Sequence, residues 1–468
     1  MIPVSLSWVA EQIQGELIDA NNHSMVIESV STDTRNIEQG ALFIALQGPN
    51  FDGHNFINQA QKAGAVAAIV THPIDLDIAQ IIVSDTKLAL GLLAGAVKKE
   101  VAPLTVGITG SSGKTTVKEM VAAILSRRGK VLATKGNFNN DIGVPLTLLR
   151  LEADHEFAVV EMGANHLGEI AYTTDMVKPD VATIVNAAAA HLEGFGSLLG
   201  VARAKSEIFK GLPDHGVAVL NVDSQFYDFW KSKLRLTKIH GFSCNKPADY
   251  YAEDTILGLD GCAQFDLVSP QGRVSVSLSL PGMHNVSNAL VAAALAIGVG
   301  ATLNDVVEGL RNMPLVAGRL NVKQLSKQVK ILDDTYNANV ASVNAAIDLL
   351  ASFAGRRVLI LGDMAELGEK ARYYHEQVGE YAKQKGIDQL YTLGVLSQSA
   401  SGVFDSQGKH FSDITLLCEF ILNQLAGEQR DITILVKGSR SAKMERVVEA
   451  LEGSNLGKFE RVRERIAC

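Results

Sequence analysis

The sequence predicts an α/β protein of three domains: a small α/β N-terminal domain (1–84), a central domain on a mostly parallel sheet (85–313) and a C-terminal Rossmann-like domain (314–468). Three observations support this. At 468 residues the chain is too long for a single hydrophobic core. From residue 104 onward, short apolar runs typical of buried parallel strands alternate with helical patterns. The character of the sequence also changes near residues 84 and 314, where we expect the domain boundaries.

Composition and charge exclude several classes of protein. Because no run of ~18 uninterrupted apolar residues occurs, we expect no transmembrane helix. The N-terminus lacks the basic segment and cleavage site of an export signal, which argues against export. The net charge of −8, without a basic tract, argues against nucleic acid as a partner. The scattered cysteines fit a reducing cytoplasm and argue against a disulfide framework or a zinc site: Cys244, Cys262, Cys418 and Cys468.

The N-terminal region contains short strand-like runs at 42–46 and 67–70, separated by turns rich in Gly, Asn and Asp such as 47–53. A helical stretch at 88–99 then leads to the first strand of the central domain, at 104–108. The short strands and polar turns indicate a small α/β unit that differs in character from the central domain.

The segment 105–116, TVGITGSSGKTT, is the most informative in the chain. An apolar strand enters a glycine-rich turn that ends in Lys114 and Thr115, and a helical pattern comes next. Glycine lets backbone N–H groups close around phosphate oxygens, the lysine supplies positive charge, and the threonine hydroxyl can reach Mg²⁺. The ordinary Walker A motif would place a glycine at position 108, which is Ile108 here, so this is a shorter variant. A chance glycine turn is the alternative, but the flanking strand and helix favour a P-loop-type ATPase domain.

A second strand of the central domain, at 157–160, ends in Glu161. Ligands of open α/β sheets gather at the carboxyl ends of strands, so Glu161 can complete a magnesium site with Thr115. An isolated glutamate at a strand end is more often solvated. The phosphate loop makes the ligand interpretation the better one.

Other polar positions of the central domain are ambiguous from the residues alone. His191 comes after the strand at 181–185, and Lys205 lies in a stretch of helical composition. A lone histidine is more often structural and a lone helical lysine is more often solvated, so neither is assigned a role here. The polar loop 135–143 can wrap a ligand or form a network of turns.

Beyond the central strands, the segments 266–268 and 274–280 alternate apolar with polar residues, which predicts half-exposed antiparallel strands. The last region again alternates strands and helices, which predicts the Rossmann-like domain. In it, Arg319 can neutralise charge on a transferring phosphoryl group, and Asp334 can bind a ribose hydroxyl or belong to a simple turn.

Taken together, the ordered motifs resemble the Mur ligases, the ATP-dependent amide ligases of peptidoglycan precursor synthesis. The segments 333–339 and 362–368 look most like the member of this family that adds D-alanyl-D-alanine, although Val340 stands where the family often has proline. The D-x-A-H-T-P and D-N-P-R segments usual in the related MurE ligases are absent from the sequence, and folylpolyglutamate synthetases do not share the first domain. The motifs that carry the resemblance are Gly110–Thr116, Gly136–Gly143, Glu161–Asn165, His191–Gly196, Lys205, His284–Ala289, Gly318–Arg319 and Asp334–Asn337.

The resemblance implies a reaction. ATP phosphorylates the terminal carboxylate of a UDP-N-acetylmuramoyl-tripeptide, and the amine of D-alanyl-D-alanine attacks the acyl phosphate. The products are UDP-N-acetylmuramoyl-pentapeptide, ADP and phosphate. The implied partners are these small molecules and Mg²⁺, with no nucleic acid and no membrane insertion, and the protein is expected to be a cytoplasmic monomer.

The resemblance also implies roles for individual residues. The catalytic residues would be Lys114, His191, Lys205 and Arg319. One Mg²⁺ would be held by Thr115 and Glu161, and a second by His191 and a carbamylated Lys205. ATP would contact Gly110, Ser111, Ser112, Gly113, Lys114, Thr115, Thr116, Asn139, Asn285, Asn288, Arg319 and Asp334.

The substrates would be bound in two further places. The UDP pocket would use Ser31, Asp33, Arg35, Phe43, Asp52 and His54, although a surface turn without a ligand is the alternative. The remaining substrate contacts would come from Tyr336, Asn337, Lys437, Ser439 and Arg440, the last three near the dipeptide. Because such a site is split among three domains, we expect the domains to close around bound substrates.

Two other functions remain open from the sequence. One is a ligase of the same superfamily with a different amino acceptor, and the other is a nucleotide-dependent switch that performs no ligation. The sequence does not reveal whether the third residue of the tripeptide is lysine or diaminopimelate.

Overall fold

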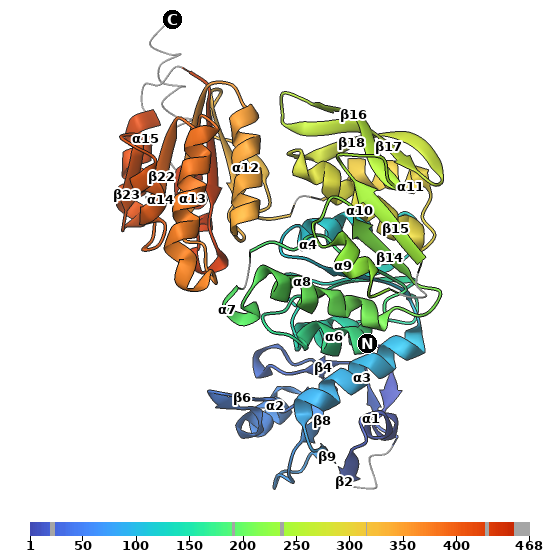
Figure 1. Cartoon of the computed structure of the whole chain (residues 1–468). Helices are drawn as coiled ribbons and strands as arrows, with labels where there is room; N and C mark the ends of the chain where they lie inside the picture. The colour runs from blue at the N-terminus through green and yellow to red at the C-terminus, as the bar shows by residue number, and fades with distance from the viewer. Residues whose placement is uncertain (19–23, 190–191, 235–237, 315, 426–429, 454–468) are drawn as a thin grey trace, which may run out of the picture.

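The structure is a computed structural model that describes residues 1–18, 24–189, 192–234, 238–314, 316–425 and 430–453. Within these residues the main sheets have five, nine and six strands and follow one another along the chain. Figure 1 shows the N-terminal unit in blue at the bottom, the central unit above it, and the C-terminal unit in orange to red at the upper left. The predicted α/β class is confirmed.

The N-terminal sheet has the strand order β2-β9-β8-β5-β4, parallel except for the edge pair β2 and β9. The strands predicted at 42–46 and 67–70 are found as β5 and β8. The strands of this unit are β1 (Val4–Ser5), β2 (Glu16–Ile18), β3 (Val26–Ile27), β4 (Val30–Ser31), β5 (Ala41–Ile44), β6 (Gln47–Gly48), β7 (Phe51–Asp52), β8 (Ala65–Val70) and β9 (Ala79–Ile82). The helices are α1 (Leu6–Gln12), α2 (Ile57–Ala63) and the 3₁₀ segments η2 (Thr34–Asn36) and η3 (Gly53–Phe56).

Helix α3 (Thr86–Val101) runs along the boundary between the N-terminal and central units (Figure 1). Asp85 begins it as an N-cap, because its carboxylate accepts hydrogen bonds from the N–H groups of Lys87 and Leu88, at 2.8 and 2.9 Å. The apolar face of α3 packs on helices α5 and α6 of the central unit. The helix predicted at 88–99 is therefore present.

The central sheet has the order β11-β12-β10-β13-β14-β15-β16-β17-β18, parallel from β11 to β16 and antiparallel from β16 to β18. Its strands are β10 (Leu104–Thr109), β11 (Val131–Ala133), β12 (Phe157–Glu161), β13 (Val181–Ile184), β14 (Val217–Asn221), β15 (Lys238–Ser243), β16 (Tyr250–Leu257), β17 (Cys262–Ser269) and β18 (Gly272–Pro281). Its helices are α4 (Lys114–Leu125), α5 (Gly143–Leu148), α6 (Glu169–Val177), α7 (Leu192–Phe195), α8 (Leu198–Ser206), η4 (Glu207–Gly211), α9 (Tyr227–Lys231), α10 (His284–Gly298) and α11 (Leu303–Arg311).

The parallel part of this sheet is buried on both faces. Along β12, Ala158 and Val160 join the hydrophobic cluster under α3 and α6, whereas Phe157 and Val159 join the cluster under α4 and α10. This explains why the strand is apolar throughout. The half-exposed antiparallel strands predicted at 266–268 and 274–280 are found in β17 and β18.

The C-terminal sheet has the order β19-β20-β24-β21-β22-β23, parallel except for the edge pair β19 and β20. Because β24 inserts between β20 and β21, the carboxyl ends of these three strands lie side by side, where ligands of such sheets bind. The strands are β19 (Asn321–Gln324), β20 (Val329–Asp334), β21 (Arg356–Gly362), β22 (Gln389–Leu393), β23 (Gly408–Phe411) and β24 (Ile432–Lys437). The helices are α12 (Val340–Ser352), η5 (Gly368–Lys370), α13 (Ala371–Gln384), α14 (Gln398–Val403), α15 (Ile414–Leu425), η6 (Arg440–Ala442) and α16 (Glu445–Glu452).

Two predictions from composition can be compared with these elements. No helix in the described part of the chain is long and apolar enough to cross a membrane. Cys244, Cys262 and Cys418 carry free thiols, while Cys468 lies outside the described residues.

Candidate active site

The glycine-rich loop lies between β10 and α4. Gly113 has φ +77°, and a Cβ at this position would lie 2.8 Å from Oδ1 of Asn288, so the position requires glycine. Asn186, directly after β13, holds the loop: its Oδ1 accepts hydrogen bonds from the N–H groups of Ser111 and Ser112, at 3.1 and 2.9 Å. We did not single out Asn186 from the sequence. Its position at a strand end beside the loop is the signal that could have found it.

Lys114 and Thr115 open helix α4 at this loop. The ammonium group of Lys114 donates to the carbonyl of Gly110 at 2.8 Å, and burial lowers the pKa of Lys114 while the nearby Glu161 acts against this shift. The hydroxyl of Thr115 donates to Oε2 of Glu161 at 3.0 Å, and Nδ2 of Asn139 donates to Oε1 at 2.7 Å. The predicted pair Thr115 and Glu161 is thus brought together, and its oxygen donors fit a hard cation such as Mg²⁺.

Lys205 lies at the end of α8 and lines the same cavity, of about 340 Å³, as Lys114, Thr115 and Glu161. Its side chain is only 1% exposed, and burial together with the charge of Lys114 lowers the pKa of Lys205 well below its ordinary value. A lysine in this setting spends more time as the neutral amine, which can react with CO₂. The predicted ligand His191 lies outside the described residues.

The C-terminal unit touches the loop through two side chains. Nη2 of Arg319 donates to the hydroxyl of Thr115 at 3.2 Å, and Nδ2 of Asn339 donates to the carbonyl of Ser111, also at 3.2 Å. The guanidinium of Arg319 stacks on the ring of Tyr336, 4.2 Å from its centroid, which fixes its direction. The site is therefore shared between two units.

A second cavity, of about 180 Å³, lies beside the loop between α10 and the C-terminal sheet. The predicted nucleotide residues Thr116, Asn285, Asn288 and Asp334 line it. Within α10, Nδ2 of Asn288 donates to Oδ1 of Asn285 at 2.8 Å, so the two amides are held in fixed orientations.

Lys437, which the resemblance places near the dipeptide, lines this second cavity, because it ends β24 next to the end of β20. It forms a buried ion pair with Asp334, and its ammonium also donates to the carbonyl of Asn337 at 2.9 Å. Burial lowers the pKa of Lys437, and the carboxylate of Asp334 opposes this shift. Ser439 is also turned inward, since its hydroxyl donates to the carbonyl of Asp363 at 2.6 Å.

Comparison with known proteins agrees with this geometry. Three family models cover most of the chain: "Mur ligase family, catalytic domain" matches 26–103, "Mur ligase middle domain" matches 108–296, and "Mur ligase, glutamate ligase domain" matches 318–440. The chain belongs to the Mur ligase family. The resemblance seen in the sequence is confirmed, and with it the three-domain α/β fold class.

Relatives within the Mur ligase family are similar over almost their full length. The UDP-N-acetylmuramoyl-tripeptide–D-alanyl-D-alanine ligase of Escherichia coli is 50% identical, covering 97% of this chain and 99% of its own. The crystal structure of MurF from Acinetobacter baumannii has a TM-score of 0.92 at 37% identity, covering 97% and 99%. MurF from Thermotoga maritima in complex with ADP has a TM-score of 0.81 at 28% identity, covering 91% and 97%.

In this Mur ligase the residues predicted to hold UDP do not line either cavity at the loop. Asp33 and Arg35 form an exposed pair at 2.6 Å, and the bond to Arg35 lowers the pKa of Asp33 to about 2. Phe43 is 2% exposed in the core of the N-terminal unit. The ring of His54 is fully engaged: Nδ1 bonds to Asp52 at 2.6 Å and Nε2 accepts from the N–H of Thr71 at 2.9 Å. Phe43 and His54 therefore stabilise the polar turns of the N-terminal unit from positions in its interior.

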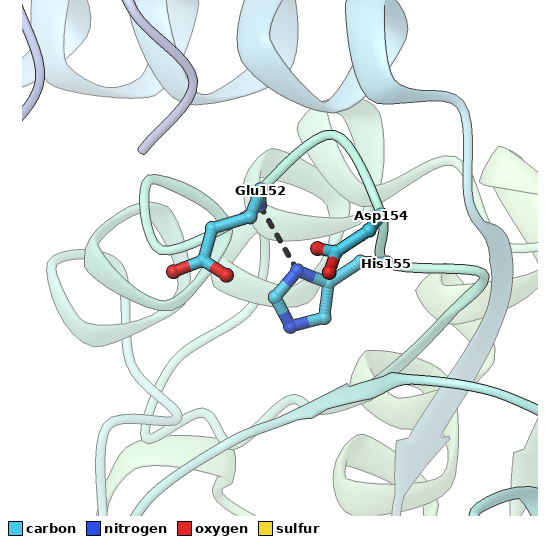
Figure 2. A group of neighbouring side chains, drawn as sticks. All are labelled: Glu152, Asp154 and His155. Atoms are coloured by element: carbon cyan, nitrogen blue, oxygen red, sulfur yellow. Dashed lines mark hydrogen bonds between the residues drawn. The ribbon is translucent and has the colours of Figure 1, made fainter.

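The sixth predicted residue, Ser31, lines a separate cavity of about 500 Å³ between β4 and β11. Three potential metal ligands, Glu152, Asp154 and His155, lie near it (Figure 2). The N–H of Glu152 donates to Nδ1 of His155 at 3.0 Å, and the ammonium of Lys130 pairs with both carboxylates and lowers the pKa of each. This group is therefore an exposed ion-pair network in which Lys130 offsets part of the charge of the two carboxylates.

Proposed function

We propose that this Mur ligase joins D-alanyl-D-alanine to UDP-N-acetylmuramoyl-tripeptide at the expense of ATP, through an acyl phosphate. One observation carries the proposal: a single cavity is lined by the phosphate loop, by Thr115 and Glu161, and by the buried Lys205. Arg319, from the C-terminal unit, lines the same cavity. The 50% identity to the Escherichia coli UDP-N-acetylmuramoyl-tripeptide–D-alanyl-D-alanine ligase supports the choice of substrates.

In this proposal the loop binds the phosphates of ATP. Lys114 and Arg319 approach the transferring phosphoryl group from two sides and stabilise the charge that develops on its oxygens. Thr115 and Glu161 would hold Mg²⁺, which supplies further positive charge at the phosphates. The substrate carboxylate enters from the side of Lys205 and attacks the γ-phosphorus, ADP leaves, and the amine of the dipeptide displaces phosphate from the acyl phosphate.

Lys205 would react with CO₂ to form a carbamate and serve, with His191, as a ligand for a second Mg²⁺. Its burial and lowered pKa support this role, because the neutral amine is the reactive form. A carbamate would also replace a buried amine beside Lys114 with an anion, which is electrostatically favourable there.

The second cavity would take the nucleoside of ATP. Asn285 and Asn288 would lie near adenine and Asp334 near the ribose, with Lys437 orienting Asp334 through their ion pair. The remaining loop residues Gly110, Ser111, Ser112, Gly113 and Thr116 and the neighbouring Asn139 complete the nucleotide contacts.

The N-terminal unit would hold the UDP group through the polar turns that carry Ser31, Asp33, Arg35 and Asp52. Phe43 and His54 would act by supporting these turns. The acceptor side would use Tyr336, Asn337 and Arg440, which line the larger cavity, with Ser439 positioning the segment that carries Arg440. We also propose the domain limits 1–84, 85–313 and 314–468, a monomer, and a cytoplasmic location where ATP is supplied.

The test is mass spectrometry of a reaction that contains ATP, Mg²⁺, UDP-N-acetylmuramoyl-tripeptide and D-alanyl-D-alanine. We expect UDP-N-acetylmuramoyl-pentapeptide and an equimolar amount of ADP. Parallel reactions use a tripeptide whose third residue is lysine or diaminopimelate. ADP without a new amide would contradict the acceptor and favour another Mur ligase reaction. ATP hydrolysis that is independent of both substrates would favour a nucleotide switch.

A further inference from the structure

The segment between β21 and η5 carries a carboxylate into the larger cavity. Gly362 ends β21 beside the ends of β20 and β24, and the chain then passes through Asp363 and Met364 to Glu366. Glu366 lines the cavity together with Lys114, Lys205 and Arg440. The proposed ligase mechanism leaves this residue without a role.

The backbone at Glu366 is in an unfavourable conformation. Its φ is +61°, in the left-handed region that glycine adopts readily and that a glutamate avoids because of its Cβ. If the side chain at this position had no function, we would expect glycine or asparagine here. Strained backbone of this kind is retained where the direction of a side chain matters.

The neighbouring residues impose this conformation. The carboxylate of Asp363 accepts hydrogen bonds from the N–H groups of Val395, Leu396 and Ser397, at 3.1, 3.0 and 2.8 Å. The N–H of Met364 donates to Nε2 of the buried His375 at 2.9 Å. The backbone is thus fixed just before Glu366, whose exposed side chain starts from a defined position at the cavity.

Charges of both signs line the rest of this cavity. Lys114, Arg319 and Arg440 contribute cations, the carboxylate of Glu161 binds Thr115 and Asn139, and the carboxylate of Glu169 binds Asn165 and His166 just before its own helix. Glu366 and Lys114 line the same cavity, and the charge of Glu366 favours the protonated form of Lys114. Arg440 lies after β24 in η6, on the same cavity, where its exposed guanidinium pairs with Glu445 through Nη1 at 3.1 Å and keeps its other N–H groups for a ligand. A dipeptide zwitterion needs one anionic and one cationic group, and these two residues supply them.

We propose that Glu366 binds the ammonium group of the acceptor dipeptide, with Arg440 binding its carboxylate. This rests on the proposed function. In this arrangement the amino end of the dipeptide points toward the phosphate loop, where the acyl phosphate forms, and Glu366 is a substrate-binding residue that selects an acceptor with a free amine.

The test compares steady-state kinetics of wild type and Glu366→Gln. Losing the charge of a hydrogen-bonded carboxylate should raise KM for D-alanyl-D-alanine about 10- to 100-fold, with KM for ATP and for the UDP-tripeptide unchanged. A dipeptide analogue whose amino group is replaced by a hydroxyl should bind the wild type more weakly. Its inhibition constant should be at least about 10-fold higher than KM for D-alanyl-D-alanine. In the variant this preference should be lost.

Two further variants separate binding from structure. Glu369→Gln changes an exposed glutamate in the adjoining η5, outside the residues that line the cavity, and should leave all three KM values unchanged. Glu366→Gly removes the strain and should raise the dipeptide KM as Glu366→Gln does, without lowering the midpoint of thermal unfolding. An unchanged dipeptide KM in Glu366→Gln, with a wild type that ligates, would overturn the assignment of Glu366. A wild type that forms no pentapeptide would instead overturn the proposed function.

Discussion

Four buried or half-buried lysines of this Mur ligase show how the surroundings decide what one side chain does. Lys118 donates to the carbonyl of Thr134 at 2.7 Å, and Lys437 is paired with Asp334. Lys114 donates to the loop itself. Lys205, at 1% exposure, lies near the charge of Lys114, and both its burial and this charge lower its pKa. A buried amine in this state is costly as a cation, so its chemistry is expected to be that of a neutral nucleophile.

Removing the amine of Lys205 should therefore abolish most activity, and the loss should be repairable. We expect Lys205→Ala to lower kcat by at least about 100-fold, since a bound metal contributes several kcal/mol of charge stabilisation. Added formate or acetate should restore part of the rate by replacing the carbamate oxygen atoms.

The control is Lys210→Ala, which changes an exposed lysine of η4 one turn further on. It should keep the wild-type rate with and without added carboxylic acid. A Lys205→Ala variant with wild-type kcat would contradict the carbamate role.

At the scale of elements, strand ends and helix starts position the site. Helix α12 illustrates this, because its N-cap Asn339 has two tasks. Its Oδ1 accepts from the N–H of Ser342 at 2.9 Å in a capping box, while its Nδ2 reaches the carbonyl of Ser111 in the phosphate loop. Helix α11 begins with a similar capping box at Thr302, without such a contact.

These two caps form a matched pair for mutation. Asn339→Ala and Thr302→Ala should each lower the free energy of unfolding by about 1 kcal/mol, measured by urea denaturation, because each removes a cap. Asn339→Ala alone should also raise KM for ATP, by roughly 3- to 10-fold, since it loosens the loop contact. Equal ATP KM values in the two variants would show that the contact to Ser111 has no part in nucleotide binding.

The packing of α13 on the segment after β21 predicts that the C-terminal unit loses stability in acid. His375 is buried, its Nδ1 donates to the carbonyl of Ala371 at 2.7 Å, and its Nε2 must stay unprotonated to accept from Met364. Burial lowers the pKa of His375 below its ordinary value of 6.5. Below pH 6.5 the unfolded chain therefore binds a proton that the folded chain does not, so stability falls as pH falls, until the folded pKa is reached.

Within that window, we expect His375 to lower the free energy of unfolding by up to about 1.4 kcal/mol for each unit that the pH falls. Urea denaturation of wild type and His375→Gln at about pH 7.5 and about pH 5.5, on either side of the ordinary histidine pKa, measures it. The variant should be less stable at the higher pH but should lose less on acidification. The same pH dependence in both proteins would exclude His375 as the titrating group and would point to other histidines whose pKa is lowered by burial, such as His155, His240 and His284.

At the scale of the whole molecule, the C-terminal unit meets the phosphate loop through Arg319 and Asn339, each by one hydrogen bond to the loop or its first helical turn. Few direct bonds leave room for the units to move relative to one another. ATP and the UDP-substrate bind to different units in the proposed function, so together they favour a closed arrangement.

Small-angle X-ray scattering should detect this closure. We expect the radius of gyration to fall when a non-hydrolysable ATP analogue and UDP-N-acetylmuramoyl-tripeptide are both added, and to fall less with either alone. Arg319→Ala should weaken the response, because it removes the side chain that links the C-terminal unit to Thr115. Superimposable profiles with and without both ligands would rule out the closure.

The sequence by itself determined the class of the protein and the centre of its chemistry. Apolar runs such as 104–108 and 157–160 predicted strands buried on both faces, and the loop 110–116 together with Glu161 predicted the phosphate and magnesium site, because such signals are local. The ordered motifs also placed the chain in the Mur ligase family.

Only the tertiary structure decided which distant residues meet. The pairing of β24 between β20 and β21 puts Lys437 against Asp334 on the smaller cavity and brings Glu366 to the larger cavity, and neither contact can be predicted from the local sequence. Asn186 and the inward positions of Phe43 and His54 were likewise decided by packing. The physical reason is that strand order and burial depend on contacts between segments far apart in the chain, whereas turns, caps and strands depend on neighbouring residues.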